Sequence, residues 1–247
     1  MKQQLFLDNA IEKINHKEKN TVTKTSNFKT THYLVSKENK KKYKKEIGDY
    51  FVISFKYETL YTKTSILTKE VEKIIKSFLK KYQNNDKVLI IGLGNKDVDA
   101  DSLGYFVTNK LIATNHYEDF LTIPKIALFN PSVTEKTGIS SYKLIEMVVN
   151  DLKPDCIIMV DSLKTNNKDY LNQAIEINDT GIIPGILLNS PKEINKKTFN
   201  IPVLSIGVPT CLEIEKDLYT STTIHEVLSL SSTIISNALN NIFIKIK

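Results

Sequence analysis

Hydrophobic positions along the chain alternate between short continuous runs and sets at helical spacing. Residues 88–93 form an apolar run interrupted only by Gly92, which is typical of a strand buried on both faces of a parallel sheet. Residues 68–79 have apolar side chains on one helical face, with Thr68 as the expected N-cap. The same patterns predict further strands at 50–55, 125–129, 156–160 and 203–207, and further helices at 102–113, 140–152 and 223–242. Strands that alternate with helices predict an α/β fold, a three-layer α/β/α sandwich with a mostly parallel central sheet.

The N-terminal part of the chain has a different pattern. Its first 45 residues are polar and lysine-rich and have no sustained apolar period. We therefore expect a mobile basic segment over residues 1–45, with the character of a propeptide, and a single α/β domain over residues 46–247. No run has the length of a membrane span or the pattern of a signal peptide. These features predict a soluble, cytoplasmic protein without a membrane partner.

The charged residues and cysteines argue against nucleic-acid binding and against a disulfide-stabilised protein. The net charge is +6, and all 34 basic residues are lysine. Without arginine the chain has no bidentate guanidinium group for bases and phosphates, so we expect no direct binding of nucleic acid. Cys156 and Cys211 are too few for a disulfide framework, and Cys156 lies in an apolar run. This usage is typical of reduced thiols in a cytosol.

Aspartates stand where two of the expected strands end. Asp101 follows the strand exit that Gly92 and Gly94 permit, and Asp161 comes directly after the strand at 156–160. In an open α/β sheet the functional crevice lies at the carboxyl ends of the strands. Two carboxylates held close together do not both ionise easily, so one can act as an acid and the other as a base.

Such a pair has three interpretations. It can activate water against a peptide carbonyl and protonate the leaving amine, or it can hold a divalent metal. Strand-end aspartates also cap helices and stabilise turns without any chemistry. A dinucleotide site is disfavoured, because the third glycine position of that fingerprint is Asp97, whose charge opposes a pyrophosphate.

Several longer strings occur in order between residues 86 and 210. They are Gly92-Leu-Gly-Asn95, Asp101-Ser-Leu-Gly104, Thr137-Gly-Ile139, Lys153-Pro-Asp155, Asn178-Asp-Thr-Gly-Ile-Ile-Pro-Gly185 and Ile201-Pro-Val-Leu-Ser-Ile-Gly-Val-Pro-Thr210. Together they resemble the germination protease of endospore formers, and the combination is far more specific than any one string. By this resemblance the chain is identified as a shortened or divergent member of that family.

The resemblance implies a peptidase-like domain similar to hydrogenase maturation peptidases, a homotetramer, and an atypical aspartic-type endopeptidase made as a zymogen. The implied substrates are small acid-soluble spore proteins, cleaved during germination in the spore core or forespore. The family's catalytic pair matches Asp101 and Asp161, one acting as general base and the other as general acid. Asn95, Asp179 and Gly181 are expected to bind substrate or shape the site, and no cofactor is expected.

Two departures from the family pattern bear on activity. Ile183 stands where the family usually has histidine, which weakens the interpretation as a metal site. The family's propeptide site contains Arg-Thr-Asp, and this chain has no arginine. Two alternatives therefore stay open: a catalytically inactive homologue with a binding or regulatory role, and a metal-dependent processing peptidase.

Overall fold

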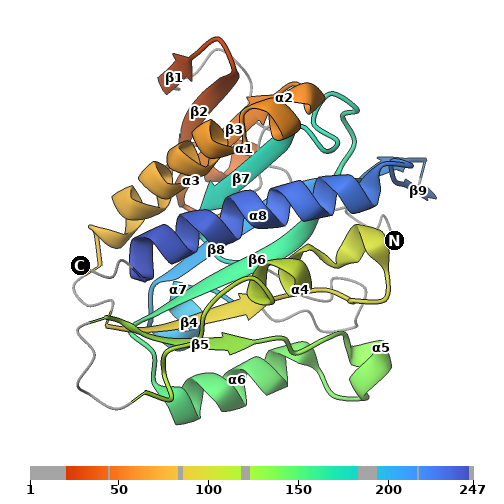
Figure 1. Ribbon diagram of the computed structural model, residues 1–247. Helices are drawn as coiled ribbons and strands as arrows, with labels where there is room; N and C mark the ends of the chain where they lie inside the picture. The colour runs from red at the N-terminus through yellow and green to blue at the C-terminus, as the bar shows by residue number, and fades with distance from the viewer. Residues whose placement is uncertain are drawn as a thin grey trace.

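The structure, a computed structural model, describes residues 21–43, 45–82, 86–117, 123–182, 194–215 and 217–244. The described residues form a nine-stranded sheet in the order β1-β2-β3-β7-β8-β6-β4-β5, with β9 paired to β8. Figure 1 shows the strands in this arrangement. They are β1 (Thr21–Lys24), β2 (Phe28–Val35), β3 (Gly48–Phe55), β4 (Lys87–Gly92), β5 (Lys125–Phe129), β6 (Cys156–Thr165), β7 (Ala174–Asn178), β8 (Val203–Ile214) and β9 (Asp217–Tyr219).

Four strands of the sheet, β8, β6, β4 and β5, are parallel to one another. Their apolar runs are buried on both faces; in β4 the five residues after Lys87 are all buried. Such runs favour central parallel strands because helices cover both sides of them. The predicted α/β class is confirmed. The predicted strand runs lie within β3, β5, β6 and β8, and the run at 88–93 extends one residue past the end of β4.

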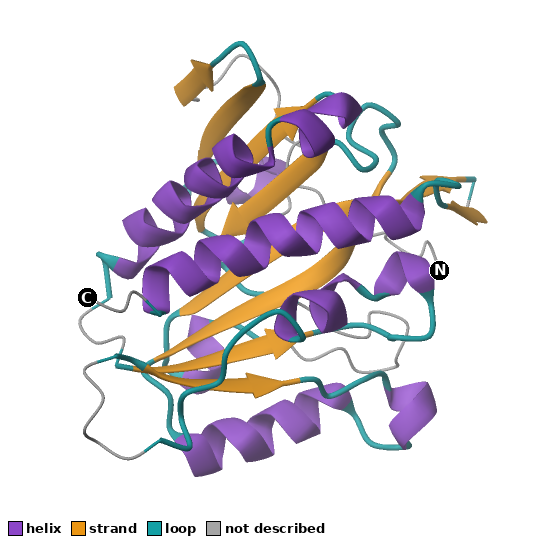
Figure 2. Cartoon of the chain, in the orientation of Figure 1, coloured by secondary structure: helices purple, strands orange, loops and turns teal. Residues whose placement is uncertain are grey.

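Helices cover the parallel strands on both faces. Figure 2 shows α3, α8 and α4 side by side in front of the strands. On that face Ile158 and Val160 of β6 enter the main core, while Ile157 and Met159 enter a second core against α6. The helices are α1 (Lys40–Tyr43), α2 (Tyr57–Thr62), α3 (Thr64–Leu79), α4 (Leu103–Thr108), α5 (Thr134–Thr137), α6 (Ser141–Leu152), α7 (Lys196–Phe199) and α8 (Ile224–Phe243), with a 3-10 turn η2 (Asp99–Asp101).

The N-terminal strands β1 and β2 lie where no strand was predicted. β2 pairs antiparallel with β3 along its whole length, from Phe28 opposite Phe55 to Val35 opposite Gly48. Its buried positions include threonine and tyrosine, so the pattern lacks a clear apolar period. Residues 21–35 thus belong to the same sheet as the domain expected to begin at residue 46. Residues 1–20 of the expected mobile segment lie outside the described residues.

Several predicted boundaries were wrong. Thr68 is not an N-cap, because α3 begins one turn earlier at Thr64 and the Thr68 hydroxyl donates to the Thr64 carbonyl (2.9 Å). The helix expected at 102–113 ends at Thr108. β6 and β8 both continue well past their predicted ends. None of the helices in the described part of the chain has the length and hydrophobicity needed to cross a bilayer.

Candidate functional site

The chain leaves β4 through a tight turn at the carboxyl edge of the sheet. The Leu93 amide donates to the Val160 carbonyl (2.9 Å), which holds this exit against β6. Gly94 has a φ of 101°, and a Cβ there would lie 1.9 Å from the Asp101 carbonyl oxygen. A side chain at this position would therefore be strained and would collide with backbone. The glycine lets the 95–101 loop fold back so closely that Asp101 lies beside the strand exit.

Asp101 is the last residue of η2, and only Ser102 separates it from α4. Its Oδ2 accepts a hydrogen bond from the Asn95 amide (2.7 Å). The Asn95 side chain shapes the same loop, because its Oδ1 accepts from the Asp97 amide (3.1 Å). Asn95 thus orients the loop around Asp101, mainly through its backbone. Its contact with a substrate stays a prediction.

The surroundings of Asp101 include groups that raise the pKa of its carboxyl and groups that lower it. Burial raises the pKa of the carboxyl, and the nearby charge of Glu135 adds to this rise. The hydrogen bond from Asn95 and the positive charge of Lys164 lower the pKa and partly offset it. The net direction is upward. A carboxyl with a raised pKa at a strand edge is suited to proton transfer.

Asp161 lies within β6 rather than at its end. Pairing between β4 and β6 stops at Gly92 opposite Val160, whereas β8 continues beside β6 and places Gly207 opposite Asp161. Asp161 is therefore the first residue of β6 beyond the edge of β4. Its Oδ1 accepts a hydrogen bond from the Ser162 amide (2.8 Å). The predicted strand end was wrong, because pairing with β8 alone sustains the strand for several more residues.

Two contacts bind the segment that carries Asp101 to the strand that carries Asp161. The Leu103 amide donates to Ser162 Oγ (3.4 Å), and Thr210 Oγ1 of β8 donates to the Ala100 carbonyl (2.5 Å). Both ends of η2 are thus fixed on the β6–β8 pair. Because side chains alternate along a strand, Asp161 faces the same layer as Met159, the layer that contains α6.

Asp179 and Gly181 lie elsewhere in the fold. β7 runs antiparallel to β8, so its last residue, Asn178, stands opposite Ser205 near the amino end of the parallel strands. Asp179 accepts a hydrogen bond from the Asp49 amide (2.8 Å), and burial raises its pKa. Gly181, with a φ of 86°, packs closely against Ile194. The structure does not bring either residue to the edge that carries Asp101 and Asp161.

Sequence reasoning missed several residues beside Asp101. Lys164 and Cys211, together with Glu135 of α5, interact with Asp101 electrostatically. Lys164 and Cys211 are opposite each other on β6 and β8. The sequence signal was weak, because both residues lie beyond the apolar runs that define the predicted strands.

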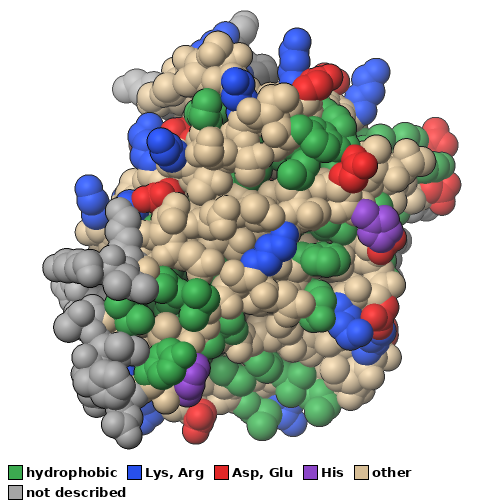
Figure 3. Space-filling view, viewed as in Figure 1, with side chains coloured by type: hydrophobic (Ala, Val, Ile, Leu, Met, Phe, Trp, Pro, Cys, Tyr) green, Lys and Arg blue, Asp and Glu red, His purple; other side chains and the backbone are tan. Residues whose placement is uncertain are grey.

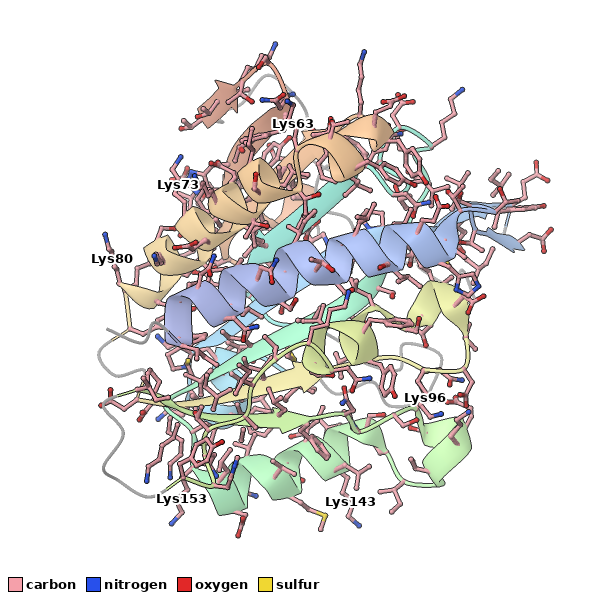
Figure 4. All side chains as sticks on the ribbon, in the orientation of Figure 1. Lys63, Lys73, Lys80, Lys96, Lys143 and Lys153 are labelled. Atoms are coloured by element: carbon pink, nitrogen blue, oxygen red, sulfur yellow. The ribbon has the colours of Figure 1, made fainter. Side chains whose placement is uncertain are left out.

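The loop between β4 and η2 carries exposed charges as well. Asp97 forms ion pairs with Lys96 (3.0 Å) and with Lys136 of α5, and Asp99 pairs with His225 of α8 (3.2 Å). Figure 4 shows Lys96 at the edge between α4 and α5. On the face in Figure 3, basic and acidic side chains are interspersed rather than segregated. These pairs hold the loop between α5 and α8 and contribute little energy individually, because they are exposed.

Metal binding by side chains needs several ligands gathered at one point. Within the described residues, no group of three or more histidine, cysteine, aspartate or glutamate side chains is arranged to hold a metal ion. Ile183, which replaces the histidine of the family pattern, lies outside the described residues.

Comparison with known proteins relates the chain to the germination protease family. The family model of the germination protease matches residues 2–232. Germination proteases from Clostridium tetani and from Geobacillus sp. (strain WCH70) are 31% and 33% identical over 73% and 75% of this chain. The matched regions cover 58% and 53% of those relatives, so the chain spans just over half the length of these curated proteins.

Solved structures give a fold comparison. A [NiFe] hydrogenase maturation protease, HycI, from Thermococcus kodakarensis aligns over 64% of this chain and 96% of its own, with a TM-score of 0.42 and 16% identity. The hydrogenase maturating endopeptidase HybD from E. coli aligns over 63% of this chain and 91% of its own, with a TM-score of 0.37 and 13% identity. The family model, which covers nearly the whole sequence, assigns the family: this chain belongs to the germination protease family.

Proposed function

We propose that this protein is an endopeptidase of spore germination that cleaves small acid-soluble spore proteins in the spore core or forespore. Membership of the germination protease family supports the reaction class. The observation that carries the proposal is the Asp101 carboxyl, which is partly buried at the carboxyl edge of the sheet and has a raised pKa. This is the environment that proton transfer to and from a peptide substrate requires.

The second acid of the proposed pair is Asp161. Three features favour a shared site. First, hydrogen bonds fix η2 to β6 and β8. Second, the loop whose Asn95 amide binds Asp101 begins just after Leu93, which packs in the core on the α6 side, and third, Glu135 of α5 interacts electrostatically with Asp101. Asp161 faces that same layer, because it lies two residues after Met159 in β6. The two carboxyl groups therefore belong to neighbouring segments at one edge of the sheet.

The proposed reaction needs one proton on the pair. The ionised carboxylate takes a proton from water while the water oxygen attacks the peptide carbonyl carbon. The C–N bond then breaks, and the protonated carboxyl gives its proton to the leaving amine. The cycle returns the pair to one proton in total, with no metal or cofactor in the scheme.

The test is cleavage of a purified small acid-soluble spore protein by the full chain. We expect Asp101→Asn and Asp161→Asn each to lower the rate at least about 100-fold, because an amide cannot transfer the proton. Asp169→Asn is the matched control, since Asp169 is exposed in the turn before β7. Cleavage by both site variants at the parent rate contradicts the proposed pair.

Two further measurements distinguish the aspartate mechanism from a metal-dependent peptidase and from an inactive homologue. Cleavage that persists with a chelator supports acid–base catalysis by the aspartates, whereas cleavage that a chelator abolishes indicates a metal-dependent peptidase. A folded protein that binds the substrate without cutting it is a binding or regulatory homologue.

Assembly as a homotetramer and synthesis as a zymogen belong to the same proposal. Light scattering of the purified chain and sequencing of its N-terminus after incubation test them.

A further inference from the structure

A two-stranded ribbon extends past the carboxyl edge of the parallel sheet. The β4–β6 pairing ends at Val160, but β6 and β8 stay paired as far as Thr165 opposite Leu212. β8 then turns back into β9, and these two strands form a hairpin that ends the ribbon. Figure 1 shows β9 beyond the ends of β4 and β5. The β8–β9 hairpin therefore projects past the edge at which Asp161 lies.

The strand pairing assigns the two faces of this hairpin, because residues in register on neighbouring strands face the same side of a sheet. Asp161 and Thr165 are four residues apart in β6, so they share a face. Thr165 pairs with Leu212, and Leu212 pairs with Tyr219. Ile214 is two residues after Leu212 in β8 and faces the same side. Leu212, Ile214 and Tyr219, the hairpin face, thus lie on the side of the sheet that carries Asp161.

A β-bulge within the ribbon does not change this assignment. Between the pairs that flank the bulge, β8 has one residue more than β6, and this extra residue is Thr210. Alternation along β6 is therefore uninterrupted between Asp161 and Thr165. Thr210 is fully buried, and its hydroxyl donates to the carbonyl of Ala100 in η2. The base of the hairpin is thus held to the segment that carries Asp101.

Apolar side chains of the hairpin face are exposed beyond the sheet. Ile214 is 49% exposed and Tyr219 is 51% exposed, and the partly buried Leu212 continues their row toward the sheet. On the opposite face of the hairpin, Leu218 is also 51% exposed, but it stands opposite Glu213. Figure 3 shows hydrophobic side chains beside acidic ones at this projecting end of the molecule. The continuous apolar row therefore lies on the side of Asp161 alone.

The size of the row indicates the kind of partner that fits it. It consists of three side chains and ends at Asp217, which is exposed opposite Ile214. A stable interface between two protein copies uses about 20–30 residues on each side. An extended peptide is far narrower, and its alternate side chains lie on one face, as recognition by strand-like peptides requires. A row of this width fits one peptide segment better than a second copy of the chain.

We propose that Leu212, Ile214 and Tyr219 bind an apolar segment of the peptide substrate, at a distance from the bond that is cut. The inference rests on the proposed function. Leu212 lies at the level of Thr165, four β6 residues past Asp161, and Ile214 lies two residues further. At about 3.3 Å per residue these levels are roughly 13 Å and roughly 20 Å past Asp161. The apolar residues of an extended substrate therefore lie about four to six positions from the scissile bond.

The first test compares the cleavage of peptides of different length. A short peptide has two residues on each side of the cleavage site mapped in the spore protein. Two longer peptides extend it by six residues, one on each side of the bond, with leucine at the fourth and sixth positions. We expect Ile214→Ser to raise KM about tenfold for one longer peptide, because half of a large apolar side chain no longer becomes buried, and to leave kcat unchanged. The KM of the short peptide should stay at the parent value.

Leu218→Ser is the matched control for this measurement. Leu218 is as exposed as the residues of the hairpin face but lies on the opposite side of the same hairpin. It should leave the KM of all three peptides unchanged. Parent values of KM for both longer peptides in Ile214→Ser would overturn the proposal, and so would equal increases in Ile214→Ser and Leu218→Ser.

The second test measures binding without catalysis. The chain has no tryptophan, so Tyr219→Trp places a single indole on the hairpin face. In an Asp101→Asn background, a longer peptide that lacks tryptophan should shift the emission to shorter wavelength, because the indole leaves water. Leu218→Trp, on the opposite face, should show no shift. No shift in Tyr219→Trp with either longer peptide, or an equal shift in Leu218→Trp, would contradict binding at the hairpin face.

Two outcomes separate this inference from its alternatives. If the parent chain cuts no spore protein, the proposed function fails, and the tryptophan variants still decide whether the hairpin face binds a peptide. Light scattering tests the other partner. If Ile214→Ser lowers the mass of the assembly and Leu218→Ser does not, a second copy covers the hairpin face and the proposal is wrong.

Discussion

At the scale of single residues, Gly94 allows the loop to fold closely against Asp101. Its positive φ and its contact with the Asp101 carbonyl are separate constraints, one on conformation and one on space. Gly138, which ends α5, has a positive φ of 69°, but a Cβ placed there would have no heavy atom within 4 Å. A side chain at Gly138 would cause backbone strain alone, whereas a side chain at Gly94 would cause strain and a steric clash.

We expect Gly94→Ala to destabilise the protein by about 3 kcal/mol or more, because backbone must move to admit the methyl group. Gly138→Ala should cost only about 1 kcal/mol, the cost of placing alanine in the left-handed region. Urea unfolding of both variants gives the two free energies. Equal losses would mean that close packing against Asp101 does not make Gly94 necessary.

Asp49 shows a second residue-scale effect, far from the proposed pair. His32 Nε2 donates to its Oδ1 (2.6 Å) and Lys81 Nζ to its Oδ2 (2.6 Å). The hydrogen bond from His32 is the largest cause that lowers the Asp49 pKa to about 2. The folded pKa is therefore below the unfolded one. The stabilisation is present above pH ~4 and is lost as the pH falls toward 2.

Asp49→Asn should accordingly remove about 2 kcal/mol of stability at neutral pH, in proportion to a shift of nearly two pH units. The free energy of unfolding of the parent should fall between pH 5 and 2.5 more steeply than that of the variant. Urea titrations across this range measure both slopes. Glu38→Gln, at an exposed glutamate, should leave the parent slope unchanged. Identical slopes for parent and Asp49→Asn would contradict the assigned cause.

At the scale of elements, the sequence predicted the strands that consist of a continuous apolar run and the helices with a strongly periodic apolar face. β4 and α8 are examples, because burial on both faces or along one stripe leaves a clear pattern. β7 was missed although all five of its residues are buried, because Glu176 and Asn178 interrupt the apolar run. Lys164 and Cys211 could not be linked to Asp101, because the bulge at Thr210 sets their register and leaves no local sequence signal.

The bulge also makes a prediction about the coupling between η2 and the sheet. Thr210→Val removes the partly buried hydrogen bond to the Ala100 carbonyl, so we expect a loss of about 1–3 kcal/mol. Hydrogen exchange should become faster in η2 and in the β6–β8 ribbon. Thr62→Val is the control, because the exposed Thr62 hydroxyl bonds only a carbonyl of its own helix. Unchanged exchange in η2 would show that Thr210 does not anchor it.

For the whole molecule, the parallel and antiparallel parts of the sheet form one continuous structure. β7 joins them, since it pairs with β3 on one side and β8 on the other. The parallel part carries Asp101 and Asp161, and the antiparallel part adds β3, β2 and β1. The N-terminal strands should therefore unfold together with the rest of the sheet rather than as a separate mobile segment.

Tyr33 and Leu34 are adjacent residues of β2 that test this cooperativity. Tyr33 is 2% exposed in a core with Tyr50 and Val52, whereas Leu34 is 56% exposed on the other face of the strand. Tyr33→Ala should lower the free energy of unfolding by about 3–5 kcal/mol, and Leu34→Ala by less than about 1 kcal/mol. Far-UV circular dichroism and tyrosine fluorescence should report one common transition in each variant. If β2 were a loosely attached segment, Tyr33→Ala would leave the main transition unchanged, because removing a side chain from an uncoupled strand costs the rest of the sheet nothing.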